Sequence, residues 1–177
     1  MKIFLAIALL VPQFCRAAPH RIVALLPSHA EIIFALGAQD SLAGVSNFCN
    51  YPPQAAKIEK AGDYYNPSIE KIASLKPDLV ILGDWASKTT ASRLANLKIK
   101  TMEIPVESSV AQVFETVRIL GALTDKTAEA EKIILRLKTK TAKLEELAKK
   151  RNSPRPRVYI EIDQPNWTAG EKSYVGD

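Results

Sequence analysis

The sequence predicts an α/β protein, in which a parallel β-sheet is flanked by helices and followed by one long helix. Short runs such as Arg21–Leu26 and Asp78–Leu82 alternate with segments of helical periodicity. Apart from their first residue these runs are entirely apolar, which is typical of parallel strands buried on both faces. The 177 residues are 47% apolar and 24% charged, a composition that suits a folded domain and excludes collagen-like and disordered classes.

The first 18 residues predict a secretory signal peptide. Lys2 precedes the apolar run Ile3–Val11, and the small residues Ala17–Ala18 provide a cleavage site. The run is too short to span a membrane, which takes about 20 apolar residues. A lipoprotein anchored at Cys15 is less favoured, because Gln13–Phe14 are not the small residues that such processing needs. A buried N-terminal helix is the remaining alternative.

The other elements follow from apolar runs and from helical spacing. Three further runs predict strands, at Leu42–Val45, Lys100–Ile104 and Arg157–Ile162. Helical spacing predicts helices at Ser28–Leu36, Pro52–Ile58, Asn66–Leu75, Thr90–Leu97 and Ser109–Leu120. Strands that alternate with helices through short loops indicate a Rossmann-like lobe with helices on both faces of the sheet.

Local residues predict where these helices begin and end. Ser28 and Glu31 have the spacing of a capping box at the start of the first helix. Asn66 is expected to cap another helix, with Pro67 at its first position. Gly37 and Gly121 are expected to stop the helices that precede them.

A long helix is predicted at Asp125–Lys150, and it would span about 39 Å at 1.5 Å per residue. Polar residues at 139–141 interrupt its apolar repeat, which favours a rigid connector over a coiled coil. The predicted organisation is therefore a signal peptide (1–18), an N-terminal lobe (19–124), a connecting helix (125–152) and the start of a truncated C-terminal lobe (153–177).

The positive charge lies on one segment. The net charge is +5, but residues 19–125 hold 10 basic and 11 acidic residues, whereas residues 126–157 hold 11 basic and 4 acidic ones. That basic segment contains neither aromatic residues nor glycine, so it lacks the composition of a nucleic-acid-binding surface. We expect a solvated helix face and no nucleic-acid partner, with an interaction scaffold as an alternative function.

The sequence does not favour catalysis or metal binding. It has no G-x-S-x-G, no Walker A motif and no G-x-G-x-x-G after a strand. Its two histidines and the single cysteine that remains after cleavage, Cys49, cannot provide a four-ligand zinc site or an intrachain disulfide. We expect no enzyme, no cofactor and no metal, although polar groups around Ser28 and His29 would favour a secreted α/β enzyme.

Aromatic residues predict a binding site. Seven rings lie in predicted loops, and three others are expected in the core (Phe34, Phe114 and Tyr159). The loop rings are Phe48, Tyr51, Tyr64, Tyr65, Trp85, Trp167 and Tyr174. In an open α/β sheet, loops at the carboxyl ends of the strands form the ligand crevice, to which Pro27 and Ser28 also belong. Aromatic faces there suit a large, flat, partly apolar ligand.

Three segments carry a resemblance to a known family. Gly44–Pro53, Gly62–Glu70 and Leu75–Ile81 resemble the helical-backbone family of periplasmic substrate-binding proteins, which serve ABC importers of vitamin B12, haem and iron–siderophore complexes. The Tyr-Pro-Pro loop at 51–53 is most similar to the vitamin B12-binding members. The resemblance implies two lobes joined by one long helix, a ligand between the lobes, and a monomeric periplasmic receptor that delivers the ligand to a permease.

The resemblance also implies roles for individual residues. Phe48 falls where the vitamin B12-binding members place a ring-contacting Tyr, and Tyr64 falls where they place a Trp. Trp167 resembles the start of a ligand-facing loop in the second lobe. Glu70 matches a Glu that docks onto an arginine pocket of the permease, although an acid at a helix start also interacts with the helix dipole. The implied ligand is a cobalamin-like corrinoid, with an iron–siderophore complex or haem as the alternative.

Overall fold

The computed structural model describes residues 18–84, 88–151, 154, 159–163, 167 and 168. Four parallel strands form its main sheet, in the order β2-β1-β3-β4. The strands are β1 (Ile22–Ala24), β2 (Leu42–Val45), β3 (Leu79–Leu82) and β4 (Thr101–Glu103). The predicted α/β class is therefore confirmed, while the predicted signal peptide lies outside the described residues except for Ala18.

Helices cover both faces of the sheet. One face carries α1 (Pro27–Ala35), α4 (Val110–Leu123) and α5 (Thr127–Lys149), and the other carries α2 (Ile69–Ser74) and α3 (Lys88–Asn96). Two short 3-10 helices, η1 (Gln39–Ser41) and η2 (Pro53–Lys57), lie in the loops on either side of β2. Apart from η1, which was not predicted, these elements match the predicted ones to within a few residues, and the helix predicted at Pro52–Ile58 is the 3-10 helix η2.

The strand residues alternate between two cores. In β1, Ile22 and Ala24 pack towards α1, α4 and α5, whereas Val23 packs towards α2 and α3. In β3, Ile81 likewise packs towards α1, α4 and α5, and Val80 packs towards α2 and α3. Because successive side chains of a strand point to opposite faces, an entirely apolar strand is what a sheet covered on both sides requires.

Two predicted helix starts are wrong by one to three residues. Helix α1 begins at Pro27, whose fixed φ and missing N–H suit the first helical position, so Ser28 lies inside the helix and caps nothing. Helix α2 is capped by Ser68, whose Oγ accepts a hydrogen bond from the backbone N–H of Lys71 at 3.2 Å. Pro67 is instead held in an isolated antiparallel bridge with Gly62.

The predicted stop at Gly37 is confirmed, but the one at Gly121 is wrong. Gly37 follows α1 with a φ of +70°, a backbone conformation that glycine adopts without strain. Gly121 lies inside α4, where a Cβ would come within 2.5 Å of the Ala130 Cβ on α5. The left-handed residue after α4 is Asp125, at a φ of +55°. Glycine at 121 therefore serves close helix packing.

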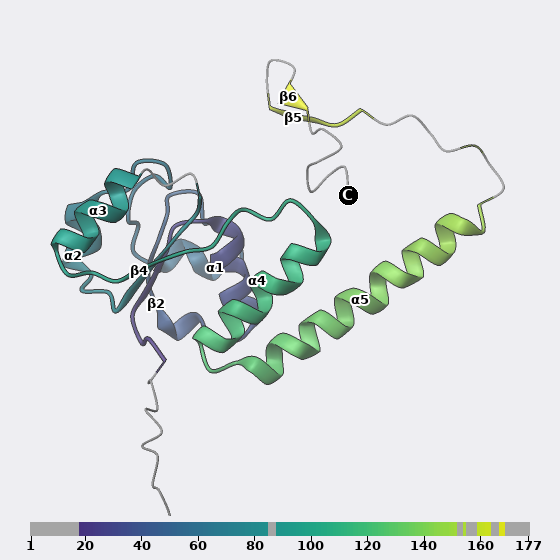
Figure 1. Ribbon diagram of the computed structural model, residues 1–177, viewed down its shortest axis with the longest axis horizontal. Coiled ribbons are helices and arrows are strands. Elements are labelled where there is room, and N and C mark those ends of the chain that lie inside the picture. The colour runs from purple at the N-terminus through teal and green to yellow at the C-terminus, as the bar shows by residue number, and fades with distance from the viewer. Residues whose placement is uncertain (1–17, 85–87, 152–153, 155–158, 164–166, 169–177) are drawn as a thin grey trace, which may run out of the picture.

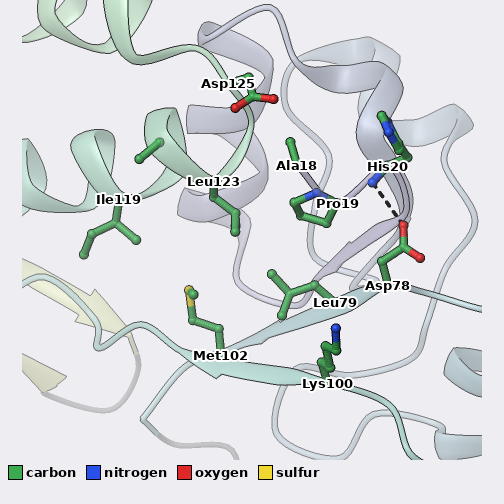
Figure 2. A pocket seen from close by; sticks show the side chains of 11 residues that line it. Ala18, Pro19, His20, Asp78, Leu79, Lys100, Met102, Ile119, Leu123 and Asp125 are labelled. Atoms are coloured by element: carbon green, nitrogen blue, oxygen red, sulfur yellow. Dashed lines mark hydrogen bonds between the residues drawn. The ribbon is translucent and has the colours of Figure 1, made fainter. Parts of the chain in front are cut away.

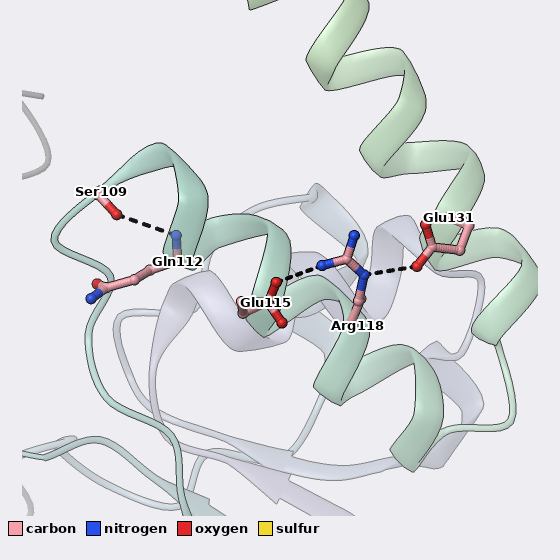
Figure 3. A network of polar contacts seen from close by, with 5 residues as sticks. All are labelled: Ser109, Gln112, Glu115, Arg118 and Glu131. Carbon is pink, nitrogen blue, oxygen red and sulfur yellow. Dashed lines mark hydrogen bonds and ion pairs between the residues drawn. The ribbon is translucent and has the colours of Figure 1, made fainter.

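Helices α4 and α5 are also joined by a polar network on their exposed side (Figure 3). The Arg118 guanidinium pairs with Glu115 on its own helix and with Glu131 on α5, where its Nε lies 2.9 Å from the carboxylate oxygen. The hydrogen bond with Glu131 and the negative charge of Glu131 raise the pKa of Arg118 most, and Glu115 raises it further. Ser109, the predicted first residue of this helix, caps α4 by accepting a hydrogen bond from the backbone N–H of Gln112.

The long helix α5 extends past the lobe (Figure 1). Its first half packs on α4 through Ala130 and Ile134, whereas Leu144 and Leu147 in its second half are more than half exposed. The predicted role as a connector between lobes stays a prediction. Beyond α5, β5 (Glu161–Asp163) pairs antiparallel with β6 (Trp167–Thr168). Tyr159, predicted in the core, is exposed because nothing in the described part of the chain packs over it.

Candidate functional site

The topology places a reversal of strand order between β1 and β3. From β1 the chain moves outward to β2, and from β3 it moves outward to β4 on the opposite side. Open α/β sheets bind ligands beyond the carboxyl ends of strands at such a point. Pro27 and Ser28 follow β1 there and are both partly exposed, which agrees with their predicted place in the crevice, while their role as ligand contacts stays a prediction.

Three aromatic rings form a contiguous surface at the outer end of this edge, which we call the aromatic ledge (Phe48, Tyr64 and Tyr65). The rings of Phe48 and Tyr64 meet edge to face, with centroids 5.3 Å apart and planes at 75°. The Tyr64 and Tyr65 centroids are 4.1 Å apart. Phe48 is 51% exposed and Tyr65 is 45% exposed, so the ledge presents apolar ring surface to solvent. Contiguous exposed aromatic surface of this kind makes the ledge a candidate contact site.

Backbone pairing next to β2 brings together the two segments of the chain that carry the rings of the ledge. The segment 59–62 runs parallel to the end of β2, because Val45 N–H donates to the Glu59 oxygen and Ala61 N–H donates to the Val45 oxygen. One step further, the Asn47 N–H donates to the Gly62 oxygen at 2.9 Å. Phe48 and Tyr64 therefore leave this pairing side by side, although they are 16 positions apart in the sequence.

The Tyr64 hydroxyl on the ledge is neutral at physiological pH. A hydrogen bond with the Tyr65 side chain, together with desolvation, raises the pKa of Tyr64 to about 12. The backbone N–H of Tyr65 also donates to Asp63 Oδ1 at 2.7 Å, a local turn that fixes the backbone between the two tyrosines. The ledge thus offers ring faces and the neutral hydroxyl of Tyr64, a surface suited to a flat ligand with hydrogen-bonding groups at its margin.

Of the other predicted loop rings, Tyr51 is the one whose side chain the structure describes, and it lies apart from the ledge. Tyr51 is 63% exposed and lines a separate groove of about 440 Å³ beside Phe34 of α1. Trp85 and Tyr174 lie outside the described residues, and Trp167 belongs to strand β6 instead of the predicted loop. The structure therefore joins Phe48, Tyr64 and Tyr65 and separates Tyr51 from them.

One buried polar side chain, His29, lies near the same edge of the sheet. His29, in the first turn of α1, is fully buried, and neither ring nitrogen has a hydrogen-bond partner. Burial lowers the pKa of His29, while the charge of Glu107 acts in the opposite direction. Neither imidazole nitrogen of His29 hydrogen-bonds to the Ser28 hydroxyl or to the Glu107 carboxylate, so these three described residues do not form a hydrogen-bonded nucleophile–base–acid arrangement.

Glu70 lies on the outer surface of α2, where a partner could reach it. Its carboxylate is 79% exposed and lies 3.6 Å from the Arg93 guanidinium of α3. The pKa of Glu70 is lowered by its own backbone N–H, then by the Ser68 hydroxyl and, less strongly, by Arg93. The carboxylate is thus ionised and accessible, and its only ion pair in the described part of the chain is a long, exposed one.

A larger pocket, of about 700 Å³, lies at the opposite end of the sheet (Figure 2). Its floor consists of Leu79, Met102, Ile119 and Leu123, and its rim includes Asp78, whose carboxylate accepts the backbone N–H of His20 at 3.0 Å. This pocket adjoins the amino ends of β1, β3 and β4. It therefore lies away from the edge where the topology gathers the loops that follow the strands.

The described residues contain no group of three or more His, Cys, Asp or Glu side chains that could hold a metal ion. Cys49 is buried, and its thiol lies 3.4 Å from the Ser46 hydroxyl. Within the same residues, none of the helices has the length and apolar character needed to cross a bilayer.

Comparison with known proteins assigns the family. The periplasmic binding protein family model matches residues 22–177, and the chain belongs to this family. An uncharacterised ABC transporter substrate-binding lipoprotein of Bacillus subtilis is 30% identical over 90% of this chain and 52% of its own length. The vitamin B12-binding protein of Salmonella choleraesuis is 30% identical over 97% of this chain and 63% of its own length.

A solved structure supports the same assignment. It is described as a "possible" iron-binding (periplasmic solute-binding) protein of Staphylococcus epidermidis, and it superimposes with a TM-score of 0.75 and 26% identity over 91% of this chain and 64% of its own. The chain therefore spans between about half and two thirds of the lengths of these relatives.

The predicted site lacks one residue that the structure places next to the ledge. Lys60 reaches from the segment beside β2 into the loop that carries Phe48, with its Nζ 2.7 Å from the Cys49 oxygen. Nothing in the local sequence indicates this contact, because it joins positions 11 residues apart. The pairing of 59–62 with β2, which directs Lys60 towards that loop, has no apolar periodicity by which it could be predicted.

Proposed function

We propose that this protein is the ligand-binding component of an ABC importer, and that it captures a cobalamin-like corrinoid outside the cytoplasm. The aromatic ledge is the observation that carries the proposal, since a corrin ring is a large, flat and partly apolar ligand that stacks on ring faces. The family, and the vitamin B12-binding protein among its relatives, support this ligand.

Titration with cyanocobalamin tests the ligand, with equilibrium dialysis read by the absorbance of the corrin. We expect saturable binding that weakens more than about fivefold in Phe48→Ala, because truncating a central aromatic contact costs more than about 1 kcal/mol. Ile119→Ala is the control: it removes an exposed apolar side chain from the pocket at the amino ends of the strands. Equal binding by Phe48→Ala and the unchanged protein would contradict a site at the ledge.

A second ligand class is favoured by one observation. The solved relative from Staphylococcus epidermidis carries an iron-binding description, so a ferric siderophore or haemin is the alternative cargo of the same ledge. Absence of cyanocobalamin binding, together with saturable binding of a ferric siderophore, would replace the corrinoid by the iron chelate. In either case the protein acts by binding and release, and it needs no catalytic residue.

We also propose that Glu70 docks the protein onto the permease. Its ionised, accessible carboxylate on the outer surface of α2 suits a cationic pocket on a partner, and its weak pair with Arg93 is easily exchanged. A periplasmic location, a monomeric receptor and a second lobe after α5 complete the proposal. Retained docking of Glu70→Gln to permease-containing vesicles would contradict this role of Glu70.

A further inference from the structure

One cation hydrogen-bonds to the loop that carries Phe48, one of the three rings of the aromatic ledge. The Lys60 ammonium donates to the backbone oxygens of Cys49, at 2.7 Å, and of Ala55, at 3.2 Å. Lys60 is partly buried, and no carboxylate pairs with it in the part of the chain that the structure describes. Because a partly buried charge needs hydrogen bonds to replace its hydration, these two carbonyl groups determine where the ammonium lies.

The two carbonyl groups belong to the beginning and the end of one loop. The side chains of Cys49 and Ala55 are buried, so the loop is fixed from below at both places, while Phe48 and Tyr51 remain exposed above it. A single ammonium thus joins two points of the loop that are six residues apart. Without it, nothing else in the described residues hydrogen-bonds the Cys49 oxygen.

Phe48 lies between two hydrogen bonds that reach the same neighbouring segment. Before it, the Asn47 N–H donates to the Gly62 oxygen at 2.9 Å, and after it, the Cys49 oxygen accepts from Lys60. The segment 60–62 that supplies both partners leads directly to Tyr64. The two neighbours of Phe48 in the chain are therefore hydrogen-bonded to the segment 60–62, which precedes Tyr64.

We propose that Lys60 is a positioning residue, which holds the Phe48 ring against Tyr64 and thereby preorganises the aromatic ledge. An exposed loop loses backbone entropy when it is ordered, and a loop already ordered in the free protein does not lose that entropy again on binding. Lys60 acts through the Cys49 carbonyl and needs no contact with the ligand. The effect on ligand affinity rests on the function proposed above, whereas the effect on the rings does not.

The contact between the rings tests the positioning role without any ligand. Nuclear Overhauser effects between the Phe48 and Tyr64 rings are measured in the full chain with selectively protonated Phe and Tyr. Lys60→Met keeps the apolar stem and removes the donors, and Lys60→Arg keeps both charge and donors. Lys57→Met is the matched control, because Lys57 is an exposed lysine of η2.

We expect the effects between the rings to disappear in Lys60→Met and to persist in Lys60→Arg and Lys57→Met. Their persistence in a folded Lys60→Met would overturn the proposal. If Lys60→Met does not fold, the unchanged chain decides: its Lys60 ammonium protons should exchange slowly with water and couple to the Cys49 carbonyl carbon. A rapidly exchanging ammonium without this coupling would overturn the proposal as well.

Cyanocobalamin then measures the consequence for binding. We expect Lys60→Met to weaken its binding about tenfold, the effect of losing one charge-assisted hydrogen bond that orders a contact residue. Lys60→Arg should restore most of this affinity. If the unchanged chain does not bind cyanocobalamin, the proposed ligand is wrong, and the ring contacts still decide the role of Lys60.

Discussion

Replacing Gly121 by alanine tests how closely α4 and α5 pack. The added Cβ would come within 2.5 Å of the Ala130 Cβ and within 3.3 Å of the Lys126 backbone oxygen. Neither neighbouring atom is the end of a flexible side chain. The overlap with the added Cβ can therefore be removed only if one helix shifts against the other. The same helices carry Leu120 and Ile134 in the core, and a shift would loosen that packing too.

The magnitude follows from two opposing effects. Alanine is about 1 kcal/mol better than glycine inside a helix, whereas forcing one carbon into a packed interior costs about 1–3 kcal/mol. Gly121→Ala should therefore lower the free energy of unfolding by up to about 2 kcal/mol. Ala130→Gly removes the opposing methyl group and should cost about 1 kcal/mol in helix propensity.

The double variant separates these effects. Exchanging the two residues places the methyl group on the other helix and removes the overlap, so the double variant should be nearly as stable as the unchanged protein. The coupling energy between the two positions should thus be about 1–3 kcal/mol. Ala128→Gly, at an exposed position of α5, controls for helix propensity alone.

Urea unfolding followed by circular dichroism gives each free energy by linear extrapolation. A stabilisation of Gly121→Ala by about 1 kcal/mol, the result for an uncrowded helical glycine, would refute the close approach of the helices. Additivity of the two substitutions within about 0.5 kcal/mol would refute it equally.

Two further predictions concern charged groups. His29 has a lowered pKa in the native state, so the unfolded chain binds more protons as the pH falls below about 6.5, and the free energy of unfolding should decrease by up to about 1.4 kcal/mol per pH unit. His29→Leu should remove this slope in urea titrations from pH 7 to pH 5; an unchanged slope would assign it to other groups. Glu70→Gln should abolish docking to permease vesicles without changing cyanocobalamin affinity, whereas Arg93→Gln, which removes only the competing guanidinium, should dock at least as well.

Much of the fold could be predicted because it depends on which short segments of the chain are apolar and must be buried. The entirely apolar runs at β1, β2 and β3 have no exposed face, and only a sheet covered on both sides buries such strands. The helix starts were less predictable. At α2, Asn66 and Ser68 are both good caps, and the bridge between Gly62 and Pro67 decides which of them is used.

The sequence predicted that loop aromatic residues form the site, but it did not predict which of these residues lie together. Loop aromatics after strands indicated a binding edge, yet their composition does not distinguish Phe48, which meets Tyr64, from Tyr51, which lines another groove. That difference arises from the course of segment 59–62 along β2. Backbone hydrogen bonds between distant segments set that course, and they leave no pattern in either segment.

The sequence by itself determined the α/β class, the long basic helix and the family, because hydrophobic periodicity and local motifs are properties of contiguous residues. Only the tertiary structure decided that Gly121 is a packing position, that His29 is buried without hydrogen-bond partners, and that Lys60 donates to the Cys49 carbonyl next to Phe48. Each of these depends on an atom contributed by a distant segment, and the approach of that segment is fixed by the packing of the whole lobe.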